Sequence, residues 1–309
     1  MLGRIVEVAQ DSRHLSAYRG FMLVRDADGD RTELGRVPLD DMAALIVHAH
    51  GVSYTNNLLV ALAERGVPMV LCGPNHQVAG VLWPFDSNFE VSKRIQAQIQ
   101  ASKPMHKRAW AMVVRAKLEQ QARLLQQLGK PYAPLDALVT QVRSGDPQNI
   151  EAQGARRYWT LLFGGGFRRD RTEPGTNAML NYGYTVLRAT TARAIAAAGL
   201  HPSIGMHHCN AANAFRLVDD LMEPFRPVID EAVWEAIQNG QNALGPEVKT
   251  AIAQAMTHDM PAPYGVTPLM GCVNRLAVSV AQYYGAERNH LELPLRSAHL
   301  INRNSADLL

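Results

Sequence analysis

Short apolar runs separated by turn residues fill the first 90 residues, and this pattern is typical of β-strands. The runs that predict strands are residues 5–8, 18–25, 37–39, 43–47, 67–72 and 78–83. An Asp-Gly pair within residues 26–30 favours a tight turn, because it supplies the positive φ angles that a hairpin needs. Residues 54–65 have helical spacing instead, and Gly66 ends that helix. We therefore expect a small β-rich domain that contains one helix.

After residues 84–88, which form the expected linker, the periodicity becomes helical. The predicted helical segments are residues 91–100, 105–128, 151–163, 177–198, 214–223, 228–238, 246–258 and 266–284. The chain is therefore predicted to be an α+β protein. A small N-terminal β-rich domain over residues 1–88 is followed by a larger all-α domain over residues 89–309.

The composition is that of a globular protein with room for two domains. The chain has 309 residues, of which 47% are hydrophobic and 19% charged, and these values exclude a disordered protein or a coiled coil. Its three cysteines form no C-x-x-C pair, which argues against disulfides and zinc-finger sites. The first residues lack a signal-peptide core, and no uncharged apolar run approaches the ~20 residues of a membrane span. We expect a soluble, cytoplasmic protein.

The formal charge of +3 conceals a strong partition along the chain. Residues 1–90 carry seven basic and eleven acidic side chains, for a net charge of −4. Residues 91–171 carry fifteen basic and five acidic side chains, for +10, and residues 172–309 carry nine and twelve, for −3. Such an asymmetry indicates a local surface for a polyanion, and the alternative is a solvated helical face.

The first candidate acid lies in residues 149–159. Glu151 falls at the predicted start of a helix, where Asn149 can cap the helix. A carboxylate at this position is also favoured by the helix dipole, so the alternative to a catalytic role is a purely structural one.

The second candidate segment is residues 205–227. Asp220 and Glu223 are three residues apart, so they are neighbours on one helix face, where a divalent cation would relieve their repulsion. On one continuous helix, His208 would lie about 22 Å from Glu223. The asparagines within residues 210–213 predict an interruption that would let the two meet.

These side chains also predict which metal would bind. Three carboxylates with one imidazole suit Mg²⁺ or Mn²⁺ better than zinc, because oxygen ligands dominate the set. His207 and Cys209 flank His208 and are weaker ligand candidates. The alternative for His208 is a hydrogen-bonded core or surface histidine.

A glycine- and arginine-rich loop follows the first candidate acid. Residues 163–171 join three glycines to three arginines, a composition that suits phosphate binding, although a flexible loop between helices is the alternative. The candidate DNA-binding side chains in this basic stretch are Arg156, Arg157, Arg168 and Arg169.

Three motifs occur in the order seen in a known family. They are E-x-x-x-A-x-x-Y-W at residues 151–159, N-A-x-L-N-Y-G-Y at residues 177–184, and G-x-x-H followed by L-x-D-D-L-x-E-P-F-R-P within residues 205–227. With these motifs the chain resembles, over essentially its whole length, the CRISPR-associated spacer-acquisition integrases, the first of the numbered Cas proteins, and in particular their type II members. One departure is Ala152, where many members have glycine.

The resemblance implies an activity and a site. It places the three metal ligands on Glu151, His208 and Glu223, with Asp220 as an accompanying catalytic acid, and the metal as Mg²⁺ or Mn²⁺. It implies an integrase and endonuclease of antiviral defence. The 3′-hydroxyl of a captured double-stranded DNA fragment would attack a phosphodiester at the end of a CRISPR repeat, and water would give nuclease activity.

The resemblance also implies partners. Relatives form homodimers through their β domains, and two such dimers are bridged by a dimer of the small second Cas protein. The net charge of −4 on residues 1–90 suits a protein-contacting role.

Two other functions remain open from the residues alone. One is a catalytically silent DNA-binding scaffold in which the acids are structural. The other is a metal-dependent hydrolase of small phosphoesters, although such a substrate needs no extended basic surface.

Overall fold

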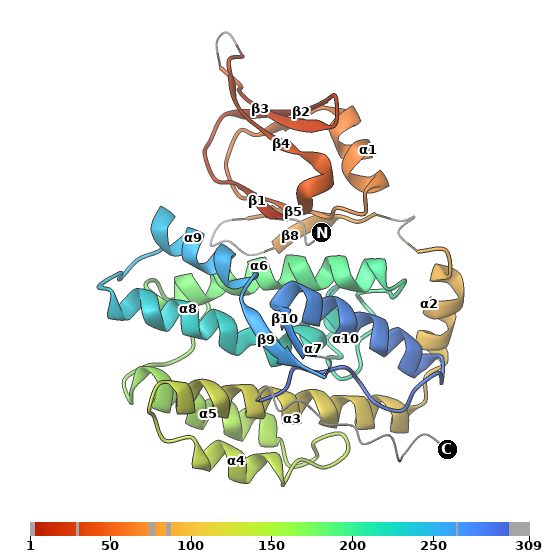
Figure 1. The fold of residues 1–309 in the computed structure, drawn as a ribbon, viewed down its shortest axis with the longest axis vertical. Helices are drawn as coiled ribbons and strands as arrows, with labels where there is room; N and C mark the ends of the chain where they lie inside the picture. Colours follow the sequence, from red (N-terminus) through yellow and green to blue (C-terminus); the bar gives the residue numbers. More distant parts are fainter. Residues whose placement is uncertain (1–3, 29–30, 74–77, 85–87, 264, 297–309) are drawn as a thin grey trace.

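The protein is described by a computed structural model over residues 4–28, 31–73, 78–84, 88–263 and 265–296. Figure 1 shows the N-terminal strands gathered above a larger, mostly helical part. The predicted α+β class, a β-rich N-terminal region followed by a helical one, is confirmed. The expected linker at residues 84–88 falls largely outside the described residues.

The N-terminal strands form two four-stranded sheets. In spatial order, the first sheet contains β1 (Arg4–Val8), β5 (Met42–Val47), β7 (Met69–Cys72) and β8 (Val78–Leu82), and the second contains β4 (Glu33–Pro38), β3 (Phe21–Asp26), β2 (Arg13–Tyr18) and β6 (Ser53–Tyr54). Helix α1 (Asn56–Glu64) begins at the N-cap Thr55, and Leu58 and Leu62 bury its apolar face in the core between these elements.

The predicted strand over residues 18–25 begins three residues before β3, and the preceding strand, β2, was not predicted. The apolar run 18–25 predicted a single strand, but the backbone turns at Arg19 and Gly20, both of which have positive φ, and β2 and β3 pair as an antiparallel hairpin. The alternating polar and apolar residues of β2 were masked by the stronger apolar run that follows.

Among the described residues, ten helical elements build the larger part. The longer helices are α2 (Val91–Gln100), α3 (Lys103–Gln127), α5 (Ile150–Phe163), α6 (Thr176–Ala197), α8 (Arg226–Gln238), α9 (Pro246–Ala255) and α10 (Leu269–Tyr284). The shorter ones are α4 (Ala133–Val139), α7 (Arg216–Met222) and the 3₁₀ turn η3 (Glu223–Phe225) that joins α7 to α8, while η1 (Leu39–Asp41) belongs to the β-rich part.

The helical part is not purely α. Strands β9 (Asp259–Ala262) and β10 (Gly265–Pro268) form an antiparallel hairpin ahead of α10. The sequence pattern had assigned the second of these strands to the start of a helix over residues 266–284. Pro268 disfavours the helical conformation for the residue before it, Thr267, which lies in β10, so the helix begins only after the proline.

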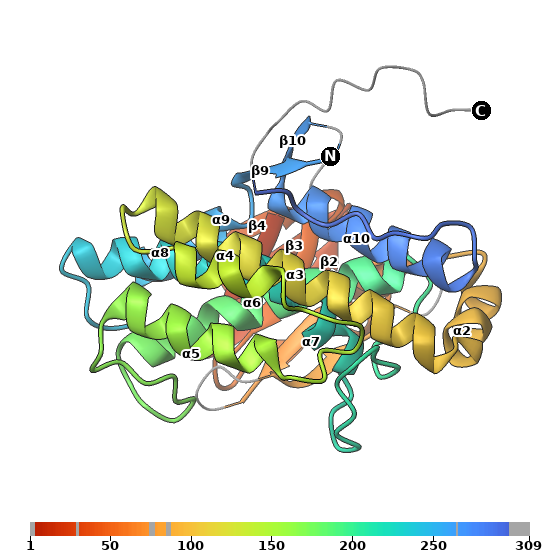
Figure 2. The same cartoon turned by 90° about the horizontal axis from the view of Figure 1, so that it is seen from below.

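Helix α3 packs against the elements that carry the candidate site residues. It crosses the molecule beneath α6 and packs against α4, α5, α7, α8 and η3 (Figure 2). The β-rich part joins this assembly through β5, whose Ala44 and Ile46 enter the helical core while Leu45 and Val47 face the core of the sheets. No described helix is long and apolar enough to cross a bilayer.

Candidate active site

The start of α5 fixes the backbone of Glu151. Asp146 accepts hydrogen bonds from the backbone N–H groups of Ile150 (2.8 Å) and Glu151 (2.9 Å). Asn149 adopts a left-handed conformation and its side chain accepts from the N–H of Ala152. The predicted cap at Asn149 is confirmed, and Asp146 supplies a second cap that the sequence pattern did not reveal.

A close helix contact then brings Glu151 over α3. A β-carbon on Gly154 would lie 2.2 Å from the Cδ2 atom of Leu118, which is fully buried, so glycine is required for α5 to approach α3 this closely. Lys117, the neighbour of Leu118, donates a 2.6 Å hydrogen bond from Nζ to Glu151 Oε1.

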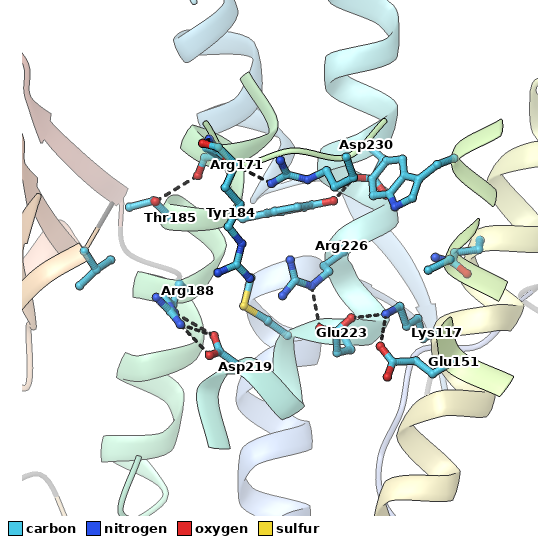
Figure 3. A pocket seen from close by; sticks show the side chains of 17 residues that line it. Lys117, Glu151, Arg171, Tyr184, Thr185, Arg188, Asp219, Glu223, Arg226 and Asp230 are labelled. Atoms are coloured by element: carbon cyan, nitrogen blue, oxygen red, sulfur yellow. Dashed lines mark hydrogen bonds and ion pairs between the residues drawn. The ribbon is translucent and has the colours of Figure 1, made fainter. Parts of the chain in front are cut away.

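The same lysine also contacts the second predicted acid. Lys117 Nζ lies 2.6 Å from Glu223 Oε2 as an ion pair, without the angular geometry of a hydrogen bond, and this buried oxygen accepts no hydrogen bond from the described residues. Arg226 donates from Nε to the other oxygen, Glu223 Oε1, over 2.9 Å. Figure 3 shows the ammonium between the two carboxylates. Glu151 and Glu223 therefore converge on one cation, the ammonium of Lys117.

Electrostatics keep these groups charged. Burial alone would raise the pKa of Glu223, but the charges of Arg226 and Lys117 outweigh burial and lower it to about 2. Burial would lower the pKa of Lys117, yet the two carboxylates hold it above its ordinary value. Glu223 is thus ionised at neutral pH, as a metal ligand must be.

His208 belongs to a loop organised by Asp220. Its Nδ1 lies 2.6 Å from Asp220 Oδ1, and this hydrogen bond, the largest cause, raises the pKa of His208. The fully buried carboxylate also accepts backbone N–H bonds from Met206 (2.7 Å), His207 (3.2 Å) and His208 (3.3 Å). Gly205 lies so close that a β-carbon there would be 2.9 Å from Asp220 Oδ2.

The structure places His208 beside Asp220, and within the described residues it does not bring the three predicted ligands onto one point. The expected interruption is present, because residues 201–215 are not helical and α7 begins at Arg216. His208 faces Asp220, whereas Glu151 and Glu223 face Lys117. Within the described residues no group of three or more Asp, Glu, His or Cys side chains is arranged to hold a metal ion.

A cleft of about 420 Å³ opens above the acid pair. Arginines from three regions line it, and Val78 of β8 contributes an edge from the β-rich part. These arginines are Arg169 and, labelled in Figure 3, Arg171, Arg188 and Arg226. Arg188 is held by a bidentate ion pair with Asp219, in which Nη2 lies 2.6 Å from each carboxylate oxygen.

The four predicted DNA-binding arginines divide into two groups. Arg169 lines the cleft, where its guanidinium donates to Asn177 Oδ1 (2.9 Å) and Asn181 Oδ1 (2.7 Å). The other three, Arg156, Arg157 and Arg168, are exposed to solvent.

A further buried acid closes one wall of the cleft. Asp230 accepts hydrogen bonds from the hydroxyls of Tyr184 (2.5 Å) and Tyr158 (2.8 Å). Burial raises the pKa of Asp230 to about 6, against the lowering effect of these two hydroxyls. The ring of Tyr184 also lies 4.5 Å from the guanidinium of Arg226.

Lys117 is one of the residues of this site that the sequence pattern did not single out, as are Arg188, Arg226 and Asp230. The sequence pattern predicts only that residues 105–128 are helical and belong to the basic stretch. Trp110, Val113 and Val114 are buried on α3, and Lys117 lies seven, four and three residues after them. This spacing places Lys117 on the buried face of the helix. A lysine on an apolar helical face was the available signal, because such a charge needs buried partners.

The chain is similar to known proteins in both sequence and fold. Residues 6–245 match the family described as CRISPR associated protein Cas1. The CRISPR-associated endonuclease Cas1 of Neisseria meningitidis is 35% identical over 234 residues, 75% of each chain.

Two solved structures share the fold. A casposase bound to its integration product has a TM-score of 0.78 and 18% identity, covering 94% of this chain and 92% of its own. A Cas6-RT-Cas1–Cas2 complex has a TM-score of 0.70 and 17% identity, covering 93% of this chain and 35% of the other.

Proposed function

Because this chain belongs to the Cas1 family of CRISPR-associated proteins, we propose that it is the integrase and DNA endonuclease of CRISPR adaptation. In this proposal it inserts captured double-stranded DNA fragments into the CRISPR array. The 3′-hydroxyl of the fragment attacks a phosphodiester at the end of a repeat. The casposase of the same fold, bound to its integration product, supports this assignment.

The observation that carries the proposal is the convergence of Glu151 and Glu223 on one cationic point, 2.6 Å from an oxygen of each, beneath an arginine-lined cleft. Two ionised carboxylates this close repel each other unless a cation lies between them. A substrate with several phosphates fits a cleft lined by several arginines.

The donor set fits Mg²⁺ or Mn²⁺. Glu223 Oε2 is buried and accepts no hydrogen bond from the described residues, and both acids offer the hard oxygens that these ions prefer. Asp220 occupies Nδ1 of His208, so Nε2 is the nitrogen available as a ligand. In the proposal Glu151, His208 and Glu223 hold the ion, which when bound acidifies the attacking hydroxyl or water and neutralises charge on the phosphate.

The other residues of the site bind and orient. Asp220 fixes the ring of His208 and the loop that carries it. Arg226 holds Glu223 in place, and Arg169 and Arg188 are anchored with their guanidinium groups at the cleft, where they would hold the DNA backbone. No protein nucleophile is required, because the attacking oxygen belongs to DNA or water.

The proposed assembly is a homodimer formed through the β-rich part, with two dimers bridged by a dimer of the small second Cas protein. The net charge of −4 on residues 1–90 supports a protein-contacting role for this part, and the Cas1–Cas2 complex of the same fold supports the partnership. The basic stretch of residues 91–171 would bind DNA through its phosphates, with strong salt dependence.

An integration assay tests the proposal. A labelled duplex is incubated with a supercoiled CRISPR plasmid and the small second Cas protein, in Mg²⁺ or Mn²⁺ and in EDTA. We expect integration that EDTA abolishes and that Glu223→Ala reduces by about 100-fold or more, since a metal contributes several kcal/mol to such a step.

The matched control is Glu235→Ala, which removes an exposed acid of α8 and should integrate normally. Normal integration by Glu223→Ala would overturn the site assignment. DNA binding by the wild type without any metal-dependent product would identify a silent scaffold instead.

A further inference from the structure

Lys117 carries a buried positive charge at the centre of the candidate site. Only 7% of it is exposed, and its ammonium lies 2.6 Å from Glu151 Oε1 and 2.6 Å from Glu223 Oε2. Placing an ammonium in such a position is costly unless anions surround it. The two acids that would bind a metal are therefore already occupied by a cation that the chain itself provides (Figure 3).

The charges at this point balance without a metal. Glu151 and Glu223 supply two negative charges, and Lys117 and Arg226 supply two positive ones. The two cations are not equivalent, because Arg226 contacts Glu223 but Lys117 contacts both acids. The guanidinium of Arg226 is also held over the ring of Tyr184, 4.5 Å from its centroid. The ammonium of Lys117 is carried on a flexible four-carbon stem, so it can move more easily.

The helices cannot readily move apart to make room for a second cation. The contact between Gly154 and Leu118 fixes α5 on α3, and Glu223 lies at the junction of α7 and η3, which also packs on α3. An ion that binds between the acids must therefore take the space that the ammonium now fills. The adaptable part of the arrangement is the lysine side chain.

We infer that Lys117 is a built-in counter-ion, a positioning residue that holds Glu151 and Glu223 together in the metal-free protein and competes with the divalent cation for the same oxygens. The inference rests on the proposed function only for the identity of the competing ion. Two consequences follow. The folded site does not depend on metal for its stability, and metal loading requires the ammonium to withdraw from the acids.

The first test is a double-mutant cycle of thermal stability in EDTA, with Lys117→Met, Glu151→Gln and the double variant. We expect Lys117→Met to lower Tm by about 5 °C or more, because it leaves two carboxylates beside one arginine. Adding Glu151→Gln should recover much of that loss, because the double variant again has balanced charges.

If Lys117→Met does not fold but the double variant does, the coupling is demonstrated directly. Additive effects of the two substitutions would overturn the inference. The matched control is Lys130→Met, which removes an ammonium that donates to the carbonyls of Leu161 and Leu162, with no acid partner among the described residues. It should show no coupling with Glu151→Gln.

The second test is calorimetric titration with Mn²⁺ in the absence of DNA. Removing the competing charge should tighten Mn²⁺ binding by about tenfold or more in Lys117→Met, and leave it unchanged in Lys130→Met. Equal or weaker binding by Lys117→Met would overturn the competition. Neither test depends on integration, so a failure of the proposed function would appear in the plasmid assay while the stability cycle still reported on Lys117.

Discussion

Glu223 and Asp230 lie seven residues apart and are both buried, yet their environments have opposite effects. Glu223 is 5% exposed and its pKa is lowered to about 2, whereas Asp230 is 1% exposed and its pKa is raised to about 6. The difference lies in their contacts. Glu223 is beside the charges of Arg226 and Lys117, and Asp230 is held by two tyrosine hydroxyls.

Burial therefore does not decide whether an acid in this core is ionised. A neutral hydroxyl stabilises a carboxylate much less than a guanidinium or ammonium does, so only the cation-paired acid is ionised well below neutral pH. This contrast separates the two roles that we assign. Glu223 is prepared to hold a cation, and Asp230 is a structural acid that fixes Tyr158 and Tyr184 in the cleft wall.

The largest expected effect comes from removing the arginine that distinguishes the two acids. Arg226→Gln leaves Glu223 buried with Lys117 as its remaining cationic contact, so we expect the free energy of unfolding at pH 7 to fall by about 3–5 kcal/mol. The pKa of Glu223 should rise toward that of Asp230. Urea unfolding at pH 7 measures the loss.

The lowered pKa of Glu223 also predicts how this loss of stability changes with pH. Because its pKa is lowered in the folded state, Glu223 stabilises the protein above about pH 4.5 and loses that contribution as the pH falls toward 2. The deficit of Arg226→Gln should therefore shrink at pH 3. A deficit as large at pH 3 as at pH 7 would show that it has another origin, and the exposed Arg143→Gln serves as the control.

For Asp230 we expect a smaller pH dependence of stability, in the opposite direction to that of Glu223. Its folded-state pKa of about 6 exceeds the ordinary value of 3.8, so between these pH values the folded protein holds a proton that the unfolded chain has released. The stability contributed by Asp230 should therefore fall as pH rises from about 4 to 6, by at most about 3 kcal/mol.

Asp230→Asn removes that dependence. We expect the variant to be less stable than the wild type at pH 4, because asparagine cannot accept from both tyrosine hydroxyls, and the difference to narrow by pH 6. Urea unfolding at pH 4, 5, 6 and 7 follows the difference. A gap that stays constant or widens would contradict a raised pKa.

The smallest effect is expected at a third buried acid, Asp220, which is satisfied by backbone N–H groups and by an imidazole. Asp220→Asn places an amide NH₂ where the carboxylate accepted hydrogen bonds, so we expect integration to fall about 10–100-fold. NMR titration should show the pKa of His208 moving down toward its ordinary value. Unchanged titration of His208 would contradict the positioning role, and Glu235→Gln is the matched control.

The sequence was sufficient for much of the fold because the local signals agreed. The segments 91–100 and 151–163 were placed within one residue of α2 and α5, and the cap at Asn149 was correct. The β2–β3 hairpin and the β9–β10 hairpin were not found. Their strands are short, and strand pairing depends on contacts that a local pattern does not contain.

In the candidate site too, the sequence indicated local features but not the contacts between distant segments. The motifs and the family resemblance that they carry pointed to Glu151, Glu223 and His208. They could not show that Lys117, which lies 34 residues before Glu151, contacts both acids. That contact depends on the close packing of α5 on α3 at Gly154. The assignment of these three side chains as ligands, and of Mg²⁺ or Mn²⁺ as the ion, remains a prediction.

The most direct test of the central claim is an anomalous difference map from crystals of this protein grown with Mn²⁺. We predict one peak within about 2.0–2.6 Å of oxygens from both Glu151 and Glu223 and of a nitrogen of His208, with the ammonium of Lys117 withdrawn from the acids. A map in which Lys117 still bridges the two carboxylates and no peak lies between them would contradict the account.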